Sequence, residues 1–268
     1  MPSRHGNGAG ARLIGVLRAA YYVPQVSFIV PAFNEQERLP LCLASIRAQP
    51  GEFEVIVVDN NSRDKTAEIA RQYADRVIFC GSQGIAAARN SGATCAESRI
   101  LAFVDADATL HHDWLSRGLE HLASRKLHGV CGMNYFTADC LPRFCLYNTY
   151  SLAFLFFLAV RSVAGRPIVA GNNLIIRKDS LMAVGGFPCF VGEDIKLSAA
   201  LNRCGFRTGF SASMRIAYSP RRFRQRGFFR VLRLWVSTLA RDLPEGSYAI
   251  DYASERRRAA PERVPESE

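Results

Sequence analysis

From residue 26 onward, short apolar runs alternate with longer stretches that mix apolar and polar residues. Four runs rich in branched and aromatic residues are typical of parallel strands covered on both faces: VSFIV (26–30), FEVIVVD (53–59), RVIFC (76–80) and ILAFVD (100–105). Apolar residues recur at helical spacing in the stretches between them, 35–48, 64–74 and 84–96. The pattern predicts an α/β fold in which β-α-β units with right-handed crossovers form an open, mostly parallel, doubly wound sheet.

The second half of the chain is less regular. A helix is predicted at 113–125 and a strand at 129–135, and the most apolar segment, 146–160, follows. That segment is shorter than the roughly 20 residues that a bilayer span needs, and Asn148 interrupts it. We therefore expect a helix that is buried or lies in a membrane interface, rather than one that spans a membrane.

Composition and charge indicate a class of ligand and a cellular compartment for this protein. With 268 residues, 49% of them hydrophobic and 22% charged, the chain resembles an ordinary globular protein. The net charge of +10 comes mostly from arginine and concentrates between Arg203 and Arg233. This stretch suits the phosphates of a nucleotide, a nucleic acid or an anionic membrane, and a solvated face is the alternative. Eight scattered cysteines without a C-x-x-C pattern are interpreted as core residues in a reducing compartment. Because Arg18 interrupts the apolar N-terminal stretch, we expect no signal peptide and predict a cytoplasmic protein, at the inner face of the membrane.

Two acids follow the fourth strand, one residue apart. Asp105 and Asp107 flank an alanine, so in an extended or turn conformation both carboxylates point to the same side. Such a pair is repulsive unless a cation lies beside it, and Mn²⁺ or Mg²⁺ bound by carboxylates and substrate phosphates is the natural occupant. A turn that closes the strand is the alternative. We interpret the nearby His111 and His112 as polar residues at a helix start, because adjacent histidines diverge in strands and helices and rarely share one ion.

Polar motifs also follow the other strands: PAFNEQERL (31–39), VVDNNSRDKT (57–66) and GIAAARNSGA (84–93). Pro31 should end the first strand, Asn34 and Glu35 should open the first helix, and Asp59 should lie at the carboxyl end of the second strand. Each motif alone can be read as turn and cap chemistry. Because ligands of open α/β sheets bind beyond the carboxyl ends of the strands, the joint occurrence of these motifs favours a ligand site.

Together with GNNLIIRKD (171–179) and GEDIKL (192–197), these motifs resemble those of the family 2 glycosyltransferases of the GT-A fold. The resemblance covers residues 26 to about 235. It implies inverting transfer from a nucleotide-sugar donor, with a UDP-sugar favoured over a GDP-sugar, to a hydroxyl acceptor, with Mn²⁺ or Mg²⁺ as cofactor. We expect a domain at 26–240 with a nucleotide-binding half (26–110) and an acceptor-binding half (111–240), flanked by an N-terminal extension (1–25) and a disordered tail (241–268).

The resemblance also implies roles for single residues. Those matched to the nucleotide are Pro31, Ala32, Asn34, Glu35, Asp59, Arg89 and Asp105, with Asp59 on the base and Asp105 on the ribose. Asp107 is matched to the metal, which Asp105 shares. Asp194 is matched to the base that inverting transfer needs to remove the acceptor proton, although a pair of acids at a helix start is the alternative. Residues matched to the substrate and its diphosphate are Asn172, Glu193, Arg221 and Arg222.

The chain departs from processive family members, which carry a Q-x-x-R-W signature, because Arg233-Leu234-Trp235 lacks the matching glutamine. We expect addition of a single sugar, to a lipid-linked or cell-envelope glycan acceptor, with peripheral membrane association and no nucleic-acid partner. One alternative is a non-catalytic basic protein that binds a nucleotide or a membrane with the same fold. Another is a nucleotidyltransferase, but PAFNEQERL is not the glycine- and lysine-rich phosphate loop expected there. Three costly acids at 105, 107 and 194 favour the enzyme.

Overall fold

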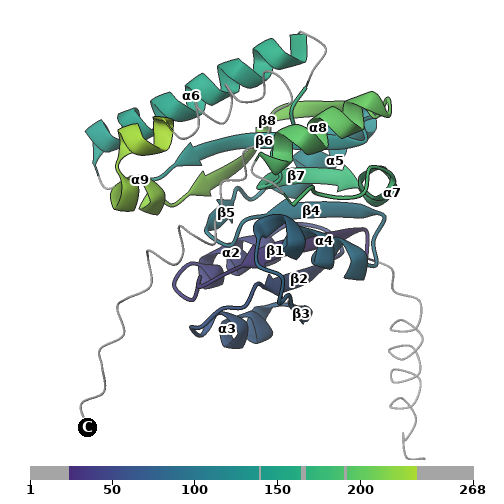
Figure 1. Cartoon of the computed structure of the whole chain (residues 1–268), viewed down its shortest axis with the longest axis horizontal. Coiled ribbons are helices and arrows are strands. Elements are labelled where there is room, and N and C mark those ends of the chain that lie inside the picture. Colours follow the sequence, from purple (N-terminus) through teal and green to yellow (C-terminus); the bar gives the residue numbers. More distant parts are fainter. Residues whose placement is uncertain (1–23, 139, 164–166, 190–191, 234–268) are drawn as a thin grey trace, which may run out of the picture.

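The computed structural model describes residues 24–233 except 139, 164–166 and 190–191 (Figure 1). The extension up to residue 23 and the tail 241–268 lie outside the described residues. The elements in chain order are β1 (Val26–Ala32), α2 (Leu39–Arg47), β2 (Phe53–Asp59), α3 (Thr66–Tyr73), β3 (Arg76–Phe79), α4 (Ile85–Cys95), β4 (Ile100–Val104), β5 (Ala108–Leu110), α5 (Trp114–Ser124), β6 (Gly129–Phe136), α6 (Leu141–Val163), β7 (Asn173–Arg177), α7 (Lys178–Ala183), α8 (Glu193–Arg203), β8 (Thr208–Tyr218) and α9 (Arg221–Arg226).

One sheet joins both halves of the chain, with the strand order β3-β2-β1-β4-β7-β6-β8-β5. The predicted parallel strands are confirmed, because β1 pairs in parallel with β2 and β4, and β2 with β3. The sheet is nevertheless mixed: β7 is antiparallel to β4 and β6, β5 is antiparallel to β8, and β6 is parallel to β8. The GNN motif therefore leads into a central strand rather than an edge strand, with Leu174, Ile175 and Ile176 fully buried. The α/β fold class is confirmed.

Helices cover both faces of this sheet. Leu43 of α2, Ala70 of α3 and Trp114 of α5 pack in the core on one face. On the other face, α4, α7 and α8 contribute buried residues such as Leu181 and Leu197. The inner strands are apolar on both sides because both of their faces are covered, as their sequence pattern predicted. α6 and α9 lie together at one end of the molecule (Figure 1), around a third cluster of buried aromatic and aliphatic residues.

The strand β1 runs past its predicted end. We expected Pro31 to terminate it, yet pairing with β2 continues to Ala32. β4 pairs only with residues 27–29 of β1, so the missing N–H of Pro31 removes no hydrogen bond to β4.

The first helix, in turn, begins later than expected. Asn34 and Glu35 do not open it: the chain bends at residues 33–34 and turns at 36–38, and Asn34 has a φ of 54°, in the left-handed region. α2 begins at Leu39, and Pro40 occupies its first turn, a position that proline favours because the first N–H groups of a helix have no intrahelical partner.

Other expectations were only partly right. Strand β8 was not predicted, although residues 210–216, FSASMRI, alternate between apolar and polar side chains as in a half-buried strand. Three cysteines, Cys42, Cys80 and Cys131, are buried as expected. Four others are exposed, so apolar neighbours in the sequence did not guarantee burial: Cys140, Cys145, Cys189 and Cys204. The apolar segment lies in α6, and no helix of the described residues has the length and apolar character to cross a bilayer.

Candidate active site

A buried arginine joins the acids after β4 to those that begin α8. Arg89, in α4, is only 2% exposed. Its Nη2 lies 3.1 Å from Asp105 Oδ1, and its Nη1 lies 3.2 Å from Glu193 Oε1 and 3.7 Å from Asp194 Oδ1. Burial lowers the pKa of Arg89, but the three carboxylates outweigh this and raise it above its ordinary value, so the guanidinium stays charged. The fold thus gathers three predicted site acids around a fourth predicted site residue, the Arg89 cation.

Asp194 is held by a backbone amide as well as by this cation. The Gly171 N–H donates to Asp194 Oδ1 at 2.9 Å, and 28% of the Asp194 side chain is exposed. Burial, and then the charge of Glu193, raise the pKa of Asp194 to about 7, while Arg89 and the Gly171 amide oppose the rise. A carboxyl group with such a pKa is suited to accept a proton at neutral pH.

Gly171 leaves no room for a side chain at this point. A Cβ added there would lie 2.7 Å from Phe187 Cε1 and 2.8 Å from both Arg89 Nη1 and Asp194 Oδ1. In the sequence, this glycine is the first residue of the GNNLIIRKD motif. In the structure, the polar groups closest to Gly171 are the carboxylate of Asp194, which is the candidate base, and the guanidinium of Arg89, which is its counter-charge.

Tyr218, the last residue of β8, is a site residue that the sequence analysis missed. Its hydroxyl lies 3.2 Å from the Asn172 backbone oxygen and 3.4 Å from Asp105 Oδ2. Asn172 Oδ1 is buried and has no hydrogen-bond partner among the described residues, which suits a group that meets a substrate. Asn173, by contrast, is fully buried and accepts the Trp114 Nε1–H at 2.7 Å, a structural role. Tyr218 was missed because β8 was not predicted, although the alternation of apolar and polar residues at 210–216 was a signal for that strand.

Asp107 and Tyr218 both line a hollow of about 180 Å³. The polar side chains that line the hollow are those of Arg38, Asp107, Thr109, Thr137, Tyr218 and Ser219. Asp105 Oδ1 lies 3.1 Å from Arg89 Nη2, and Asp105 Oδ2 lies 3.4 Å from the Tyr218 hydroxyl on the side of the hollow. Carboxylate oxygens are the ligands that Mn²⁺ and Mg²⁺ prefer, so the D-x-D residues fit a divalent cation.

Two predicted site residues from opposite halves of the chain pair with each other. Arg221 Nη2 donates to Glu35 Oε1 in a close ion pair, and Glu35 Oε2 is buried without a hydrogen-bond partner among the described residues. Burial raises the pKa of Glu35, although the bond from Arg221 opposes the rise. Asp107 also acts on Arg221 electrostatically, so the pair belongs to the neighbourhood of the D-x-D. The side chain of Arg222 lies outside the described part of the structure.

The residues matched to the nucleotide base lie at the carboxyl ends of β1 and β2. Pro31 and Ala32 are buried in β1, and Asp59, 7% exposed, is in register with Ala32. Asn34 Oδ1 accepts the Arg63 N–H at 2.8 Å and so ties together the loops after the two strands. The strand ends meet as predicted, and contact of these residues with a nucleotide stays a prediction.

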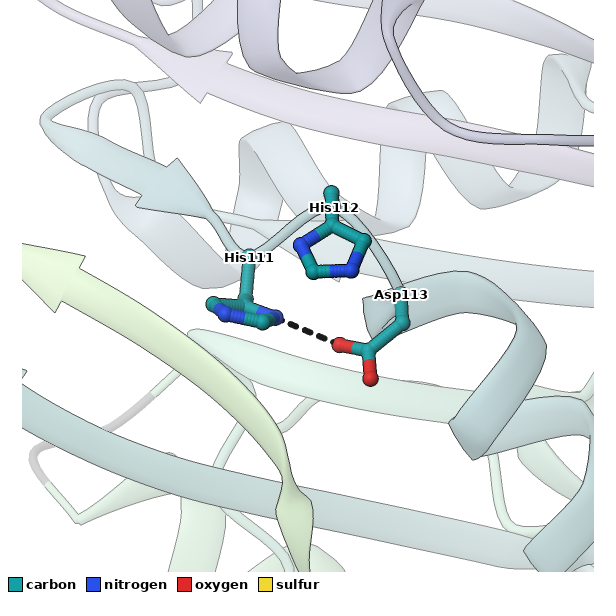
Figure 2. A group of neighbouring side chains, drawn as sticks. All are labelled: His111, His112 and Asp113. Carbon is teal, nitrogen blue, oxygen red and sulfur yellow. Dashed lines mark hydrogen bonds and ion pairs between the residues drawn. The ribbon is translucent and has the colours of Figure 1, made fainter.

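His111 and His112 precede α5, and their rings do not diverge as expected. The chain turns at this point instead of forming a strand or helix, and the ring centroids are 4.3 Å apart. With Asp113 they place one ligand atom each within 4.8 Å of the others (Figure 2). However, His111 Nδ1 lies 2.5 Å from Asp113 Oδ1 and its Nε2 lies 3.2 Å from Arg215 Nη2, so both ring nitrogens are already engaged. His111, followed by Arg117, holds the pKa of Asp113 at about 2. We assign no metal to this cluster.

The sequence model of glycosyl transferase family 2 matches residues 27–185, more than half of the chain. The chain belongs to glycosyl transferase family 2. Among its relatives, this glycosyltransferase is 31% identical over 204 residues to the glycosyltransferase AglE of Haloferax volcanii, covering 70% of this chain and 65% of that protein. It is 26% identical over 231 residues to the 4,4'-diaponeurosporenoate glycosyltransferase of Staphylococcus haemolyticus, covering 80% and 61%. The matched region is therefore less than two thirds of either relative.

Solved structures show the same fold. The mannosyltransferase PcManGT from Pyrobaculum calidifontis, in complex with GDP-Man and Mn²⁺, has a TM-score of 0.65 at 23% identity, over 89% of this chain and 73% of that one. S. aureus TarS 1-349, in complex with UDP-GlcNAc, has a TM-score of 0.56 at 19% identity, over 73% and 58%. At such identities the likeness establishes the fold of this glycosyltransferase as GT-A.

Proposed function

We propose that this glycosyltransferase transfers one sugar, with inversion, from a nucleotide-diphosphate sugar to a hydroxyl acceptor, with Asp194 as the base. The observation that carries the proposal is the shared guanidinium of Arg89, which lies 3.1 Å from Asp105 and 3.7 Å from Asp194. A single side chain, Arg89, therefore lies between the candidate base and the D-x-D, where the donor diphosphate is expected.

Proton transfer to Asp194 accompanies the displacement. The acceptor oxygen forms a bond with the anomeric carbon of the sugar, its proton passes to the Asp194 carboxylate, and the bond from the sugar to the diphosphate breaks. The electron pair leaves with the diphosphate. A single attack on the face opposite the leaving group inverts the anomeric centre. The raised pKa of Asp194, about 7, supports this role because the carboxylate is then basic enough to take the proton.

The residues of the D-x-D would hold the cation. Mn²⁺ or Mg²⁺ bound by Asp107 and by Asp105 Oδ2 would neutralise charge on the leaving diphosphate. Arg221 supplies a second positive charge, and in the described structure Glu35 keeps that guanidinium beside the D-x-D. The donor is a UDP-sugar or a GDP-sugar, and we favour UDP.

We further propose a lipid-linked glycan as the acceptor. This part rests on the acceptor half of the chain, where α6 exposes large apolar side chains such as Leu152 and Phe156. An acceptor carried by a lipid would be reached most directly by an enzyme that presents such a surface.

The test measures release of nucleoside diphosphate from a panel of UDP- and GDP-sugars in the presence of Mn²⁺, with donor affinity measured by calorimetry. Asp194→Asn should bind the donor like the wild type and release about 10²- to 10⁴-fold less diphosphate, because the base is lost. Asp107→Asn should lose the Mn²⁺-dependent part of donor affinity. Glu120→Gln, which removes an exposed acid of α5, is the matched control and should change neither quantity. Near wild-type turnover by Asp194→Asn would refute the assignment of the base.

A further inference from the structure

The outer side of α6 is apolar. The helix packs inward through residues such as Tyr147, Ser151 and Leu158, which are buried. The opposite side, a stripe about 120° wide on an ideal helix, carries exposed residues without a single charge: Leu141, Cys145, Thr149, Leu152, Ala153, Phe156 and Val160. Leu141 is 73% exposed, Leu152 58% and Phe156 72%. A surface helix of a globular protein normally carries its charged residues on this side, so α6 lacks the polar face that water would require.

Positive charge lies in a segment that packs beside α6. The helical residues 228–233 pack against α6, with Phe228 and Val231 in one cluster with Tyr147. In the same segment Arg230 and Arg233 are exposed, and Phe229 is 79% exposed. No acidic residue occurs in the sequence between Asp194 and Asp242, a stretch that contains Arg230 and Arg233.

We propose that the stripe of α6 and the helical residues 228–233 form a docking surface for an anionic phospholipid bilayer, on which the protein lies without crossing it. The apolar side chains would enter the boundary between headgroups and acyl chains, while the arginines would meet lipid phosphates. Charge argues for a bilayer rather than a second copy of the chain, because two copies joined through this surface would bring like-charged arginines together. The inference goes beyond the proposed function and does not depend on the catalytic assignment.

One aromatic side chain lies between α6 and the candidate active site. Phe136, at the end of β6, has its ring centroid 6.1 Å from that of Tyr150 in α6 and 6.1 Å from that of Tyr218. Tyr218 in turn contacts Asp105.

The experiment sediments the full-length protein with vesicles of phosphatidylcholine alone or mixed with phosphatidylglycerol. The wild type should bind the mixed vesicles, and binding should weaken in 1 M salt, where the Debye length falls to about 3 Å. The double variant Leu152→Ser/Phe156→Ser should bind at least about tenfold more weakly, because two apolar side chains no longer enter the bilayer. Leu41→Ser, at a 59% exposed position of α2, is the matched control and should bind like the wild type.

A second measurement does not depend on the stability of the double variant. In Phe156→Trp the new indole should emit at shorter wavelength with anionic vesicles and be quenched by brominated lipid more than the wild type is. Equal vesicle binding by wild type and double variant, or no binding by the wild type, overturns the proposal. So does a dimer that the double variant loses, or an introduced indole that is shielded from acrylamide without vesicles, since another copy or segment would then cover α6.

Discussion

The substitution Gly171→Ala tests whether the base is oriented by the backbone amide and the space at this glycine. The added Cβ would meet Phe187 Cε1 at 2.7 Å and both Arg89 Nη1 and Asp194 Oδ1 at 2.8 Å. Carbon contacts ordinarily lie at about 3.5–4.0 Å, so the shortfall is about 1 Å against three groups. Phe187 and Arg89 are 1% and 2% exposed, with the guanidinium 5.2 Å from the ring centroid, and they have little room to retreat.

The carboxylate of Asp194 is therefore the group that must move. A displacement of about 1 Å in a reacting group can lower the rate about 10²-fold, and we expect a fall of that order in kcat with little change in donor Kd. Overpacking of this kind should lower the free energy of unfolding by about 1–3 kcal/mol. Loss of the 2.9 Å bond from the Gly171 amide also removes an interaction that lowers the pKa of Asp194, so the rise of kcat with pH should shift to higher pH.

The assay combines diphosphate release over a pH series, donor calorimetry and thermal unfolding. Gly129→Ala is the matched control: this glycine is also buried in the sheet, but its added Cβ would have no neighbour closer than 3.4 Å. The control should keep the wild-type pH profile. The reasoning fails if Gly171→Ala turns over at the wild-type rate with an unshifted profile, or if it changes only donor affinity.

Three further predictions concern the same cluster. Since Asp194 acts as a base only when ionised and its pKa is raised to about 7, kcat/KM should fall about tenfold per pH unit below pH 7; a flat profile down to pH 5 would contradict this. Because the folded state binds that proton more tightly than the unfolded state, the contribution of Asp194 to stability is present at low pH and is lost as pH rises toward about 7. Asp194→Asn should therefore unfold at a higher temperature than the wild type at pH 8, and an equal or lower temperature would refute the argument. Arg89→Met should cost about 3–5 kcal/mol of unfolding free energy, because three acids lose their buried counter-charge. Arg117→Met, which breaks only exposed ion pairs, should cost at most about 1 kcal/mol in the same denaturant titration.

The sequence by itself determined the first half of the fold and the identity of the acids. A run such as FEVIVVD is a strand because its apolar side chains need cover on both faces, and β2 has the predicted bounds 53–59. The motifs around Asp105, Asp107 and Asp194 were readable because each is a few residues long and lies at an element boundary. Local sequence patterns were therefore sufficient to predict those features that depend only on residues close together in the chain.

Only the tertiary structure decided how distant segments meet. The pattern of β7 requires burial on both faces but does not encode direction, so its antiparallel insertion between β4 and β6 was not predictable. The bonds of Arg89 to Glu193 and of Arg221 to Glu35 join residues 104 and 186 positions apart. A charged side chain is buried only where an oppositely charged partner lies beside it. Which residues become neighbours depends on the order of the strands in the sheet, and that order is set by the packing of the whole core.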